Sequence, residues 1–165
     1  GISMLDTVKV SLDAVKNKGL KVTAPNKGDS FEIGKAKCEV MTDSILNKDN
    51  LNLSSIVIRL EFENNSFLFM GDAETANEKT RTWMKTDVLK VGHHGSNTSS
   101  SEDFLKQINP TYAVIMAGKN NSYGLPKQKI LDRLTKIGAK VYRTDEEGTI
   151  MMISNGNNIE VKENT

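Results

Sequence analysis

The side chains best suited to chemistry are two adjacent histidines and an aspartate upstream of them. His93 and His94, the only histidines of the chain, lie between glycines directly after the apolar run 88–91. Asp72 follows a glycine at the end of a second apolar run, 67–70. Neutral imidazole and carboxylate groups are usual ligands of zinc, manganese and iron, so this set indicates a metal site.

Each of these residues also has a simpler interpretation. Asp72 could cap a turn, and either histidine could be an ordinary polar residue of a surface loop. Adjacent imidazoles cannot both face the core from one extended segment, so one of the pair is expected to point into a site. A catalytic metal needs about three protein ligands and a two-metal site needs more, so Asp72, His93 and His94 do not complete a site by ligand counting.

Hydrophobic periodicity predicts a sheet with helices packed on it. The expected helices span about 5–18, 73–84, 100–109 and 126–137. Expected strands span about 21–23, 30–33, 36–41, 56–62, 66–70, 88–91, 112–117, 140–143, 149–154 and 158–162. Residues 43–52 are expected to form a loop, and Asn64-Asn65 a tight turn. We interpret 1–165 as a single domain in which residues 1–3, ahead of Met4, were added by cloning.

Composition limits the classes of function. The chain has a net charge of +1, so any recognition of phosphate must be local and not the result of a broad basic field. No run approaches eighteen apolar residues, and we therefore expect no membrane segment. A single cysteine, Cys38, cannot form an internal disulfide and is expected to fill space in a strand.

Five segments carry a resemblance to a known family when they are taken in order: 52–60, 66–74, 87–96, 121–126 and 142–150. They resemble the C-terminal half of a metallo-β-lactamase-fold hydrolase of the ComEC-like type. That type comprises the hydrolase domain of the competence protein ComEC and its free-standing, often exported relatives in Gram-positive bacteria. The joint occurrence of Gly-Asp-Ala-Glu and Lys-Val-Gly-His-His-Gly-Ser makes the resemblance specific.

The resemblance implies an α/β fold, the αββα sandwich, of which this chain is expected to form the C-terminal half plus part of the first sheet. One or two zinc or manganese ions would lie at one edge, held by Asp72 as the bridging aspartate and by His93 and His94. Ser96, Asn97 and Tyr123 are expected in the loops that line the substrate site.

Three further residues of these motifs are expected to be structural. Ser99 and Ser100 would hold the histidine loop through hydroxyl-to-backbone hydrogen bonds. Glu74 would lie in the first turn of a helix, where a carboxylate interacts favourably with the helix dipole.

Two departures from the family pattern bear on activity. The family's H-x-H-x-D-H metal motif does not occur in this sequence, and Leu125 stands where relatives commonly have a histidine. We therefore expect a metal-dependent hydrolase of phosphodiesters or nucleic acid in the full-length protein, with this chain alone inactive. The alternative is a non-catalytic binding or structural module, and a weaker third possibility is a hydrolase of small esters or lactams.

The resemblance and the expected half sandwich also suggest partners and a location. DNA or another phosphodiester would be the partner of the full-length protein. A half sandwich leaves an apolar sheet face uncovered, so self-association is expected. By resemblance alone, the protein would act outside the cell or at the cell surface of a Gram-positive bacterium.

Overall fold

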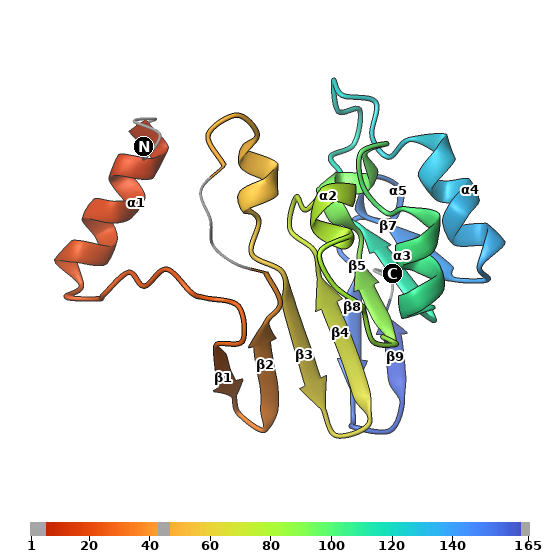
Figure 1. Cartoon of the computed structure of the whole chain (residues 1–165), viewed down its shortest axis with the longest axis horizontal. Coiled ribbons are helices and arrows are strands. Elements are labelled where there is room, and N and C mark those ends of the chain that lie inside the picture. Colours follow the sequence, from red (N-terminus) through yellow and green to blue (C-terminus); the bar gives the residue numbers. More distant parts are fainter. Residues whose placement is uncertain (1–5, 43–46, 163–165) are drawn as a thin grey trace.

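The structure of the chain is a computed structural model that describes residues 6–42 and 47–162. Its main feature is a seven-stranded sheet in the order β1-β2-β3-β4-β5-β6-β7, accompanied by a separate hairpin of β8 and β9 (Figure 1). The strands are β1 (Ser30–Ile33), β2 (Ala36–Val40), β3 (Ile58–Phe62), β4 (Asn65–Phe69), β5 (Val88–Lys90), β6 (Tyr112–Ile115), β7 (Lys140–Arg143), β8 (Met151–Ser154) and β9 (Ile159–Lys162). The predicted α/β class is confirmed.

Helical segments connect and cover these strands. They are α1 (Asp6–Asn17), η1 (Leu51–Ser54), α2 (Thr75–Glu78), η2 (Gly92–Gly95), α3 (Glu102–Ile108), α4 (Gln128–Lys136) and α5 (Thr144–Glu147), of which η1 and η2 are 3₁₀ turns. None of the described helices is long and apolar enough to cross a membrane.

The sheet changes from antiparallel to parallel at β4. Strands β1 to β4 pair antiparallel, whereas β4, β5, β6 and β7 are parallel and are joined by crossover segments. The carboxyl ends of β4, β5 and β6 therefore open at one edge of the sheet. In open α/β sheets this is the edge at which ligands bind.

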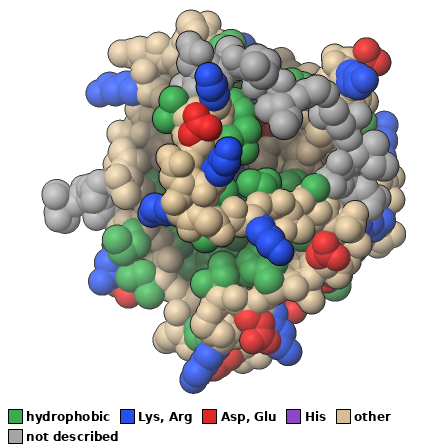
Figure 2. Space-filling model, turned by 90° about the vertical axis from the view of Figure 1, so that its left-hand side faces the viewer, with side chains coloured by type: hydrophobic (Ala, Val, Ile, Leu, Met, Phe, Trp, Pro, Cys, Tyr) green, Lys and Arg blue, Asp and Glu red, His purple; other side chains and the backbone are tan. Residues whose placement is uncertain are grey.

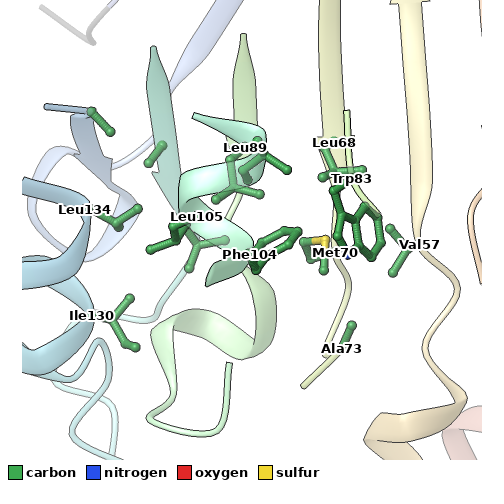
Figure 3. Close-up of a cluster of buried hydrophobic side chains, with 14 of the residues drawn as sticks. Val57, Leu68, Met70, Ala73, Trp83, Leu89, Phe104, Leu105, Ile130 and Leu134 are labelled. Atoms are coloured by element: carbon green, nitrogen blue, oxygen red, sulfur yellow. The ribbon is translucent and has the colours of Figure 1, made fainter. Parts of the chain in front are cut away.

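One row of side chains across the sheet forms the floor of the core. Leu68, Leu89, Ala113 and Val141 are register partners on four neighbouring strands. Helical side chains pack on this row and fix the sheet against the helix layer (Figure 3). The buried residues of α3 and α4 in this cluster include Phe104, Leu105, Ile108, Ile130 and Leu134, and Trp83 joins them from the irregular segment after α2.

The sequence explains the boundaries of the two longer helices on the sheet. The Ser101 hydroxyl accepts a hydrogen bond from the Phe104 N–H at the start of α3, and Asn109 ends that helix in the left-handed region. Ile130 and Leu134 are fully buried at helical spacing in α4, and Gly138 follows its end with φ of 77°. Both helices lie close to where the sequence predicts them.

Two predicted elements are wrong. The helix expected over 73–84 ends at Glu78, because the Thr80 hydroxyl and the Trp83 indole N–H bind the carbonyls of Asn77 and Glu78 that a longer helix would use. The strand expected over 21–23 does not form. Val22 there is 70% exposed, and the segment has no hydrogen-bonded neighbouring strand.

Two local features also differ from the prediction. The turn between β3 and β4 uses Glu63 and Asn64 instead of Asn64-Asn65, with φ of 52° at Glu63, because Phe62 pairs directly with Asn65. The short helix α5 was not predicted. Of the loop expected over 43–52, residues 43–46 lie outside the described residues, and Leu51–Ser54 forms η1.

Candidate metal and substrate site

The predicted site residues meet where β4 and β5 end. Asp72 follows β4 and the two histidines follow β5, and the His93 N–H donates to the Gly71 carbonyl at 3.0 Å. Because β4 and β5 are parallel neighbours, their C-terminal loops emerge side by side. The topology thus brings together residues that are well separated in the sequence.

Asp72 and His94 face each other. The distance from Asp72 Oδ1 to His94 Nε2 is 3.3 Å, and both side chains are 45% exposed. On the other side of the ring, the His94 Nδ1–H donates to the Met116 carbonyl oxygen at 2.6 Å. A carbonyl can only accept, so Nδ1 carries a proton, and the hydrogen bond fixes the ring with Nε2 facing Asp72. Metal-binding histidines are oriented in this way by a hydrogen bond to their other ring nitrogen.

His93 lies in a different environment. Its Nδ1 is 3.3 Å from Glu74 Oε1 and 3.1 Å from the Thr98 hydroxyl, and its Nε2 is 3.4 Å from the Asn52 amide nitrogen. The imidazole rings of His93 and His94 are 6.5 Å apart at 62°, so they point in different directions. Both nitrogens of His93 have protein partners, and its role as a metal ligand stays a prediction.

Glu74 is the centre of the hydrogen bonds around His93. Its carboxylate accepts from the amides of Asn50 and Asn52 at 2.9 and 3.2 Å and from the Thr98 hydroxyl at 3.0 Å. Burial alone raises the pKa of Glu74, but the hydrogen bonds and the nearby His93 outweigh it, so the pKa lies below its usual value. As predicted, Glu74 stands at the start of a helix, where it is the N-cap of α2. Its carboxylate, however, ties three loops together.

Both histidines have left-handed backbone conformations, which few residues other than glycine adopt. The φ values are 46° at His93 and 53° at His94. The flanking glycines permit this tight loop: a Cβ on Gly92 would lie 2.8 Å from the Ala73 carbonyl, and one on Gly95 would lie 2.7 Å from Pro126 Cβ. Such strain persists only where the surroundings impose it, as they often do at functional sites.

The serine-rich segment after the histidines is mostly structural. The buried Ser99 hydroxyl donates to the Gly92 and Ser96 carbonyls, so it holds the loop as predicted. Ser100 is held by its backbone N–H, which donates to the buried Glu78, and not by its hydroxyl, which has no partner among the described residues. Ser96 and Asn97 lie between the histidines and Thr98, and their place in a substrate loop stays a prediction.

Lys90 is a site residue that the sequence analysis missed. It lies in β5 three positions before the histidines, and its ammonium group donates to the Val91 carbonyl at 3.0 Å. Burial lowers the pKa of Lys90 from its ordinary value, and the negative charge of Asp72 partly offsets this effect. A lysine within an otherwise apolar strand was the signal for this position, because an ammonium group is costly to bury unless it has a charged or hydrogen-bonding partner.

A recess of about 260 Å³ opens beside His94. Its lining includes Met116, at the end of β6, and the predicted site residue Tyr123. Leu125, which the sequence analysis singled out as a departure from the family pattern, is also part of the lining. The structure therefore brings His94 and Tyr123 together at one cavity, and a substrate held at Asp72 and His94 would adjoin it.

The donor atoms at this edge fit part of a metal site. With bonds of about 2.0–2.2 Å, two ligands of a tetrahedral zinc ion lie about 3.3 Å apart, which matches the separation of Asp72 Oδ1 and His94 Nε2. The described residues contain no group of three or more His, Cys, Asp or Glu side chains that could hold a metal. Asp72 and His94 thus fit two positions, and other groups must fill the rest.

The fold and this edge site define the class of protein. The profile of the metallo-beta-lactamase superfamily matches residues 14–119, which is more than half of the chain. The chain belongs to the metallo-beta-lactamase superfamily, as its motifs predict, and metal dependence is typical of that superfamily.

Within the superfamily, the chain is related to competence proteins. It is 37% identical to ComE operon protein 3 of Bacillus subtilis over 143 residues, which cover 84% of this chain and 18% of that protein. Recombination protein 2 of Haemophilus influenzae is 42% identical over 101 residues, covering 60% of this chain and 13% of that protein. Competence protein ComA of Neisseria gonorrhoeae is 36% identical over 104 residues, covering 60% and 15%. The chain thus spans less than a fifth of the length of these relatives.

Proposed function

We propose that this chain supplies part of the active site of a metal-dependent hydrolase that acts on phosphodiesters. The observation that carries the proposal is the pairing of Asp72 with His94, in which a hydrogen bond to the Met116 carbonyl fixes the ring so that Nε2 faces the carboxylate. Both side chains are half exposed at the strand edge where such folds bind ligands, so a substrate can reach them.

Each group of residues at this site has a role that follows from its chemistry. Asp72 and His94 would hold a zinc or manganese ion, which when bound activates water and polarises a phosphoryl oxygen. Lys90 places a positive charge near Asp72 and would favour an anionic substrate at this edge. Gly92 and Gly95 keep the loop free of side chains, and the Glu74 network fixes the loop from the other side.

DNA is the phosphodiester we propose. The names of the relatives refer to competence and to recombination, and both names point to proteins that handle DNA. A net charge of +1 gives no broad attraction for a polyanion, so binding would depend on the local groups at the site. With this substrate, we also propose action outside the cell or at its surface.

Metal binding by the chain tests the site. Calorimetric titration of zinc and manganese should show binding that Asp72→Ala and His94→Ala each weaken at least tenfold. Asp132→Ala, which removes an exposed carboxylate from α4, is the matched control and should bind as the wild type does. Unchanged affinity in both site variants would contradict the proposed ligands.

Hydrolysis is tested in the full-length gene product. Metal-dependent cleavage of a single-stranded DNA oligonucleotide should be lost in Asp72→Ala and kept in Asp132→Ala. We expect this chain alone to cleave little, because two protein donors hold an ion weakly.

A non-catalytic binding module is the second candidate. Leu125 favours it, because a leucine in the lining beside His94 can neither ligate a metal nor transfer a proton. This candidate predicts DNA binding without cleavage in the full-length protein at saturating metal. The same oligonucleotide assay, followed by electrophoresis under native and denaturing conditions, separates the two.

A further inference from the structure

We propose that the recess beside His94 binds one planar ring of the substrate, a nucleobase, without selecting which base. The proposal rests on the phosphodiester function proposed above and adds the group that is recognised next to the reacting centre. Tyr123 and Leu125 are then the residues that make the protein bind a nucleotide more tightly than a phosphate without a base.

The position of the recess links it to the reacting centre. His94 is part of the lining of the recess, and its Nε2 lies 3.3 Å from Asp72 Oδ1. A phosphoryl group at Asp72 and His94 therefore places the neighbouring part of the same substrate at the mouth of the recess. In a nucleotide that neighbouring part is the sugar and its base.

The lining suits a flat apolar group and not a second phosphate. Met116 is 50% exposed and Tyr123 is 77% exposed, and Leu125 adds a branched aliphatic side chain. His94 is the one titratable side chain other than Tyr123 among the lining residues. Bases stack on exposed aromatic rings, and thioether sulfur also makes favourable contacts with rings.

Few polar groups in the lining are free to distinguish one base from another. The Asn121 amide donates to the Gly118 and Leu125 carbonyls and accepts from the Leu125 N–H. The Met116 carbonyl is bound to His94, and the N–H and carbonyl of Ala117 are bound to the Thr144 hydroxyl. Reading a base requires unpaired donors or acceptors at its edge, so we expect stacking without sequence readout.

The recess is also held firmly to the histidine loop. The Lys127 N–H donates to the Gly95 carbonyl at 3.0 Å, and Pro126 lies directly against Gly95. Tyr123 is fixed at its backbone, where its carbonyl accepts from the Lys127 ammonium group at 2.7 Å. A volume of about 260 Å³ is slightly below the range of about 300–1,000 Å³ of small-molecule pockets, and it therefore suits one ring system.

Mononucleotide binding tests the inference without any hydrolysis. Metal-free protein is titrated with thymidine 5′-monophosphate, deoxyadenosine 5′-monophosphate and 2-deoxyribose 5-phosphate, and binding is followed by ¹H–¹⁵N NMR, which detects millimolar affinities. The two nucleotides should bind within threefold of each other and shift the amide signals of Tyr123 and Leu125. The sugar phosphate lacks the base and should bind roughly 5- to 100-fold more weakly, as expected for the loss of one stacking contact.

Two variants and a control locate the effect. Tyr123→Ala removes the stacking ring and Leu125→Asp puts a charge into the recess, and each should abolish the advantage of the nucleotides over the sugar phosphate. Leu20→Asp changes an exposed leucine outside the lining and should behave as the wild type does. Thermal unfolding of each variant checks that it is folded.

The outcomes separate this inference from the proposed function. Equal binding of all three probes, no binding of any of them, or more than tenfold preference for one base would overturn the nucleobase recess. DNA cleavage by the full-length protein is measured independently and could still be metal-dependent in each of those cases. Conversely, tighter binding of both nucleotides than of the sugar phosphate, without DNA cleavage by the full-length protein, would support the recess and contradict the hydrolase.

Discussion

The imidazole of His94 bridges two strand ends: its Nδ1–H is bound to the Met116 carbonyl after β6, and its Nε2 lies 3.3 Å from Asp72 after β4. His93, the adjacent residue, is turned instead toward Glu74. Two neighbouring histidines therefore have separate tasks, one facing an accessible carboxylate and the other facing a shielded network.

Substitutions of the two histidines should have opposite effects. His94→Ala should weaken zinc binding at least tenfold and change stability little, because its side chain is half exposed. His93→Ala should leave zinc affinity within about threefold, but it should lower the free energy of unfolding by about 1–3 kcal/mol, because it removes the contacts of the ring with Glu74, Thr98 and Asn52. Calorimetry and urea denaturation measure the two quantities. A larger loss of zinc affinity in His93→Ala than in His94→Ala would show that His93 is the ligand and would contradict the assignment to His94.

A side chain at Gly95 should destabilise the protein for two reasons, the left-handed backbone and a steric contact with Pro126. Gly95 and Gly138 have nearly the same φ, 79° and 77°, but a Cβ meets Pro126 at the first and nothing within 4 Å at the second. Gly138→Ala should cost about 1–2 kcal/mol from the left-handed backbone alone. Gly95→Ala should cost a further 1–3 kcal/mol or so from overpacking. Equal losses in denaturant titration would show that the Pro126 contact relaxes freely.

Glu74 should make stability depend on pH. Its pKa is lowered on folding, so its stabilising effect is present above the unfolded-state pKa of about 4.3 and is lost as pH falls through the lower folded-state value. Glu74→Gln should therefore destabilise the metal-free protein by about 1–3 kcal/mol at pH 7. His93, the titratable group that faces Glu74, is kept in both proteins.

The pH profile of unfolding checks this expectation. The difference between the wild type and Glu74→Gln should shrink as the pH is lowered below about 4. Glu102→Gln is the control, because Glu102 is half exposed and pairs with Lys136 at 3.6 Å on the surface, so its effect should be small at every pH. A difference for Glu74→Gln that stays constant with pH would contradict the assigned cause.

Self-association remains a prediction, and the structure suggests where it would occur. Strand β1 is the edge of the sheet, with Phe31 45% and Ile33 61% exposed. Figure 2 views the side of the molecule that carries α1 and β1 and shows hydrophobic side chains gathered around a hollow. Exposed apolar edge strands commonly pair with other chains.

Sedimentation velocity tests this surface. The wild type should form dimers or larger species at high concentration, and Phe31→Lys combined with Ile33→Lys should shift it to monomer. Met151→Lys, at a similarly exposed position of the separate hairpin, should leave the association unchanged. A wild type that stays monomeric at all concentrations would contradict the prediction.

Local patterns in the sequence predicted most of the elements of the parallel half of the sheet. The apolar runs before Asp72 and His93 become β4 and β5, and the stripe with Ile130 and Leu134 becomes α4. Each of these elements buries one continuous face, so the apolar residues along it recur with a clear period. The segment after Glu78 was predicted wrongly because Trp83 packs edge-on against Phe104 from an irregular backbone, and no local period encodes such a contact.

The sequence by itself determined the family and the strand ends that carry Asp72, His93 and His94. Only the tertiary structure decided that His94 pairs with Asp72 while His93 pairs with Glu74, and that Lys90 lies near Asp72. The physical reason is that residue types and spacing fix where a side chain enters a loop. Its direction depends on left-handed backbone angles and on hydrogen bonds to groups such as the Met116 carbonyl, which come from distant parts of the chain.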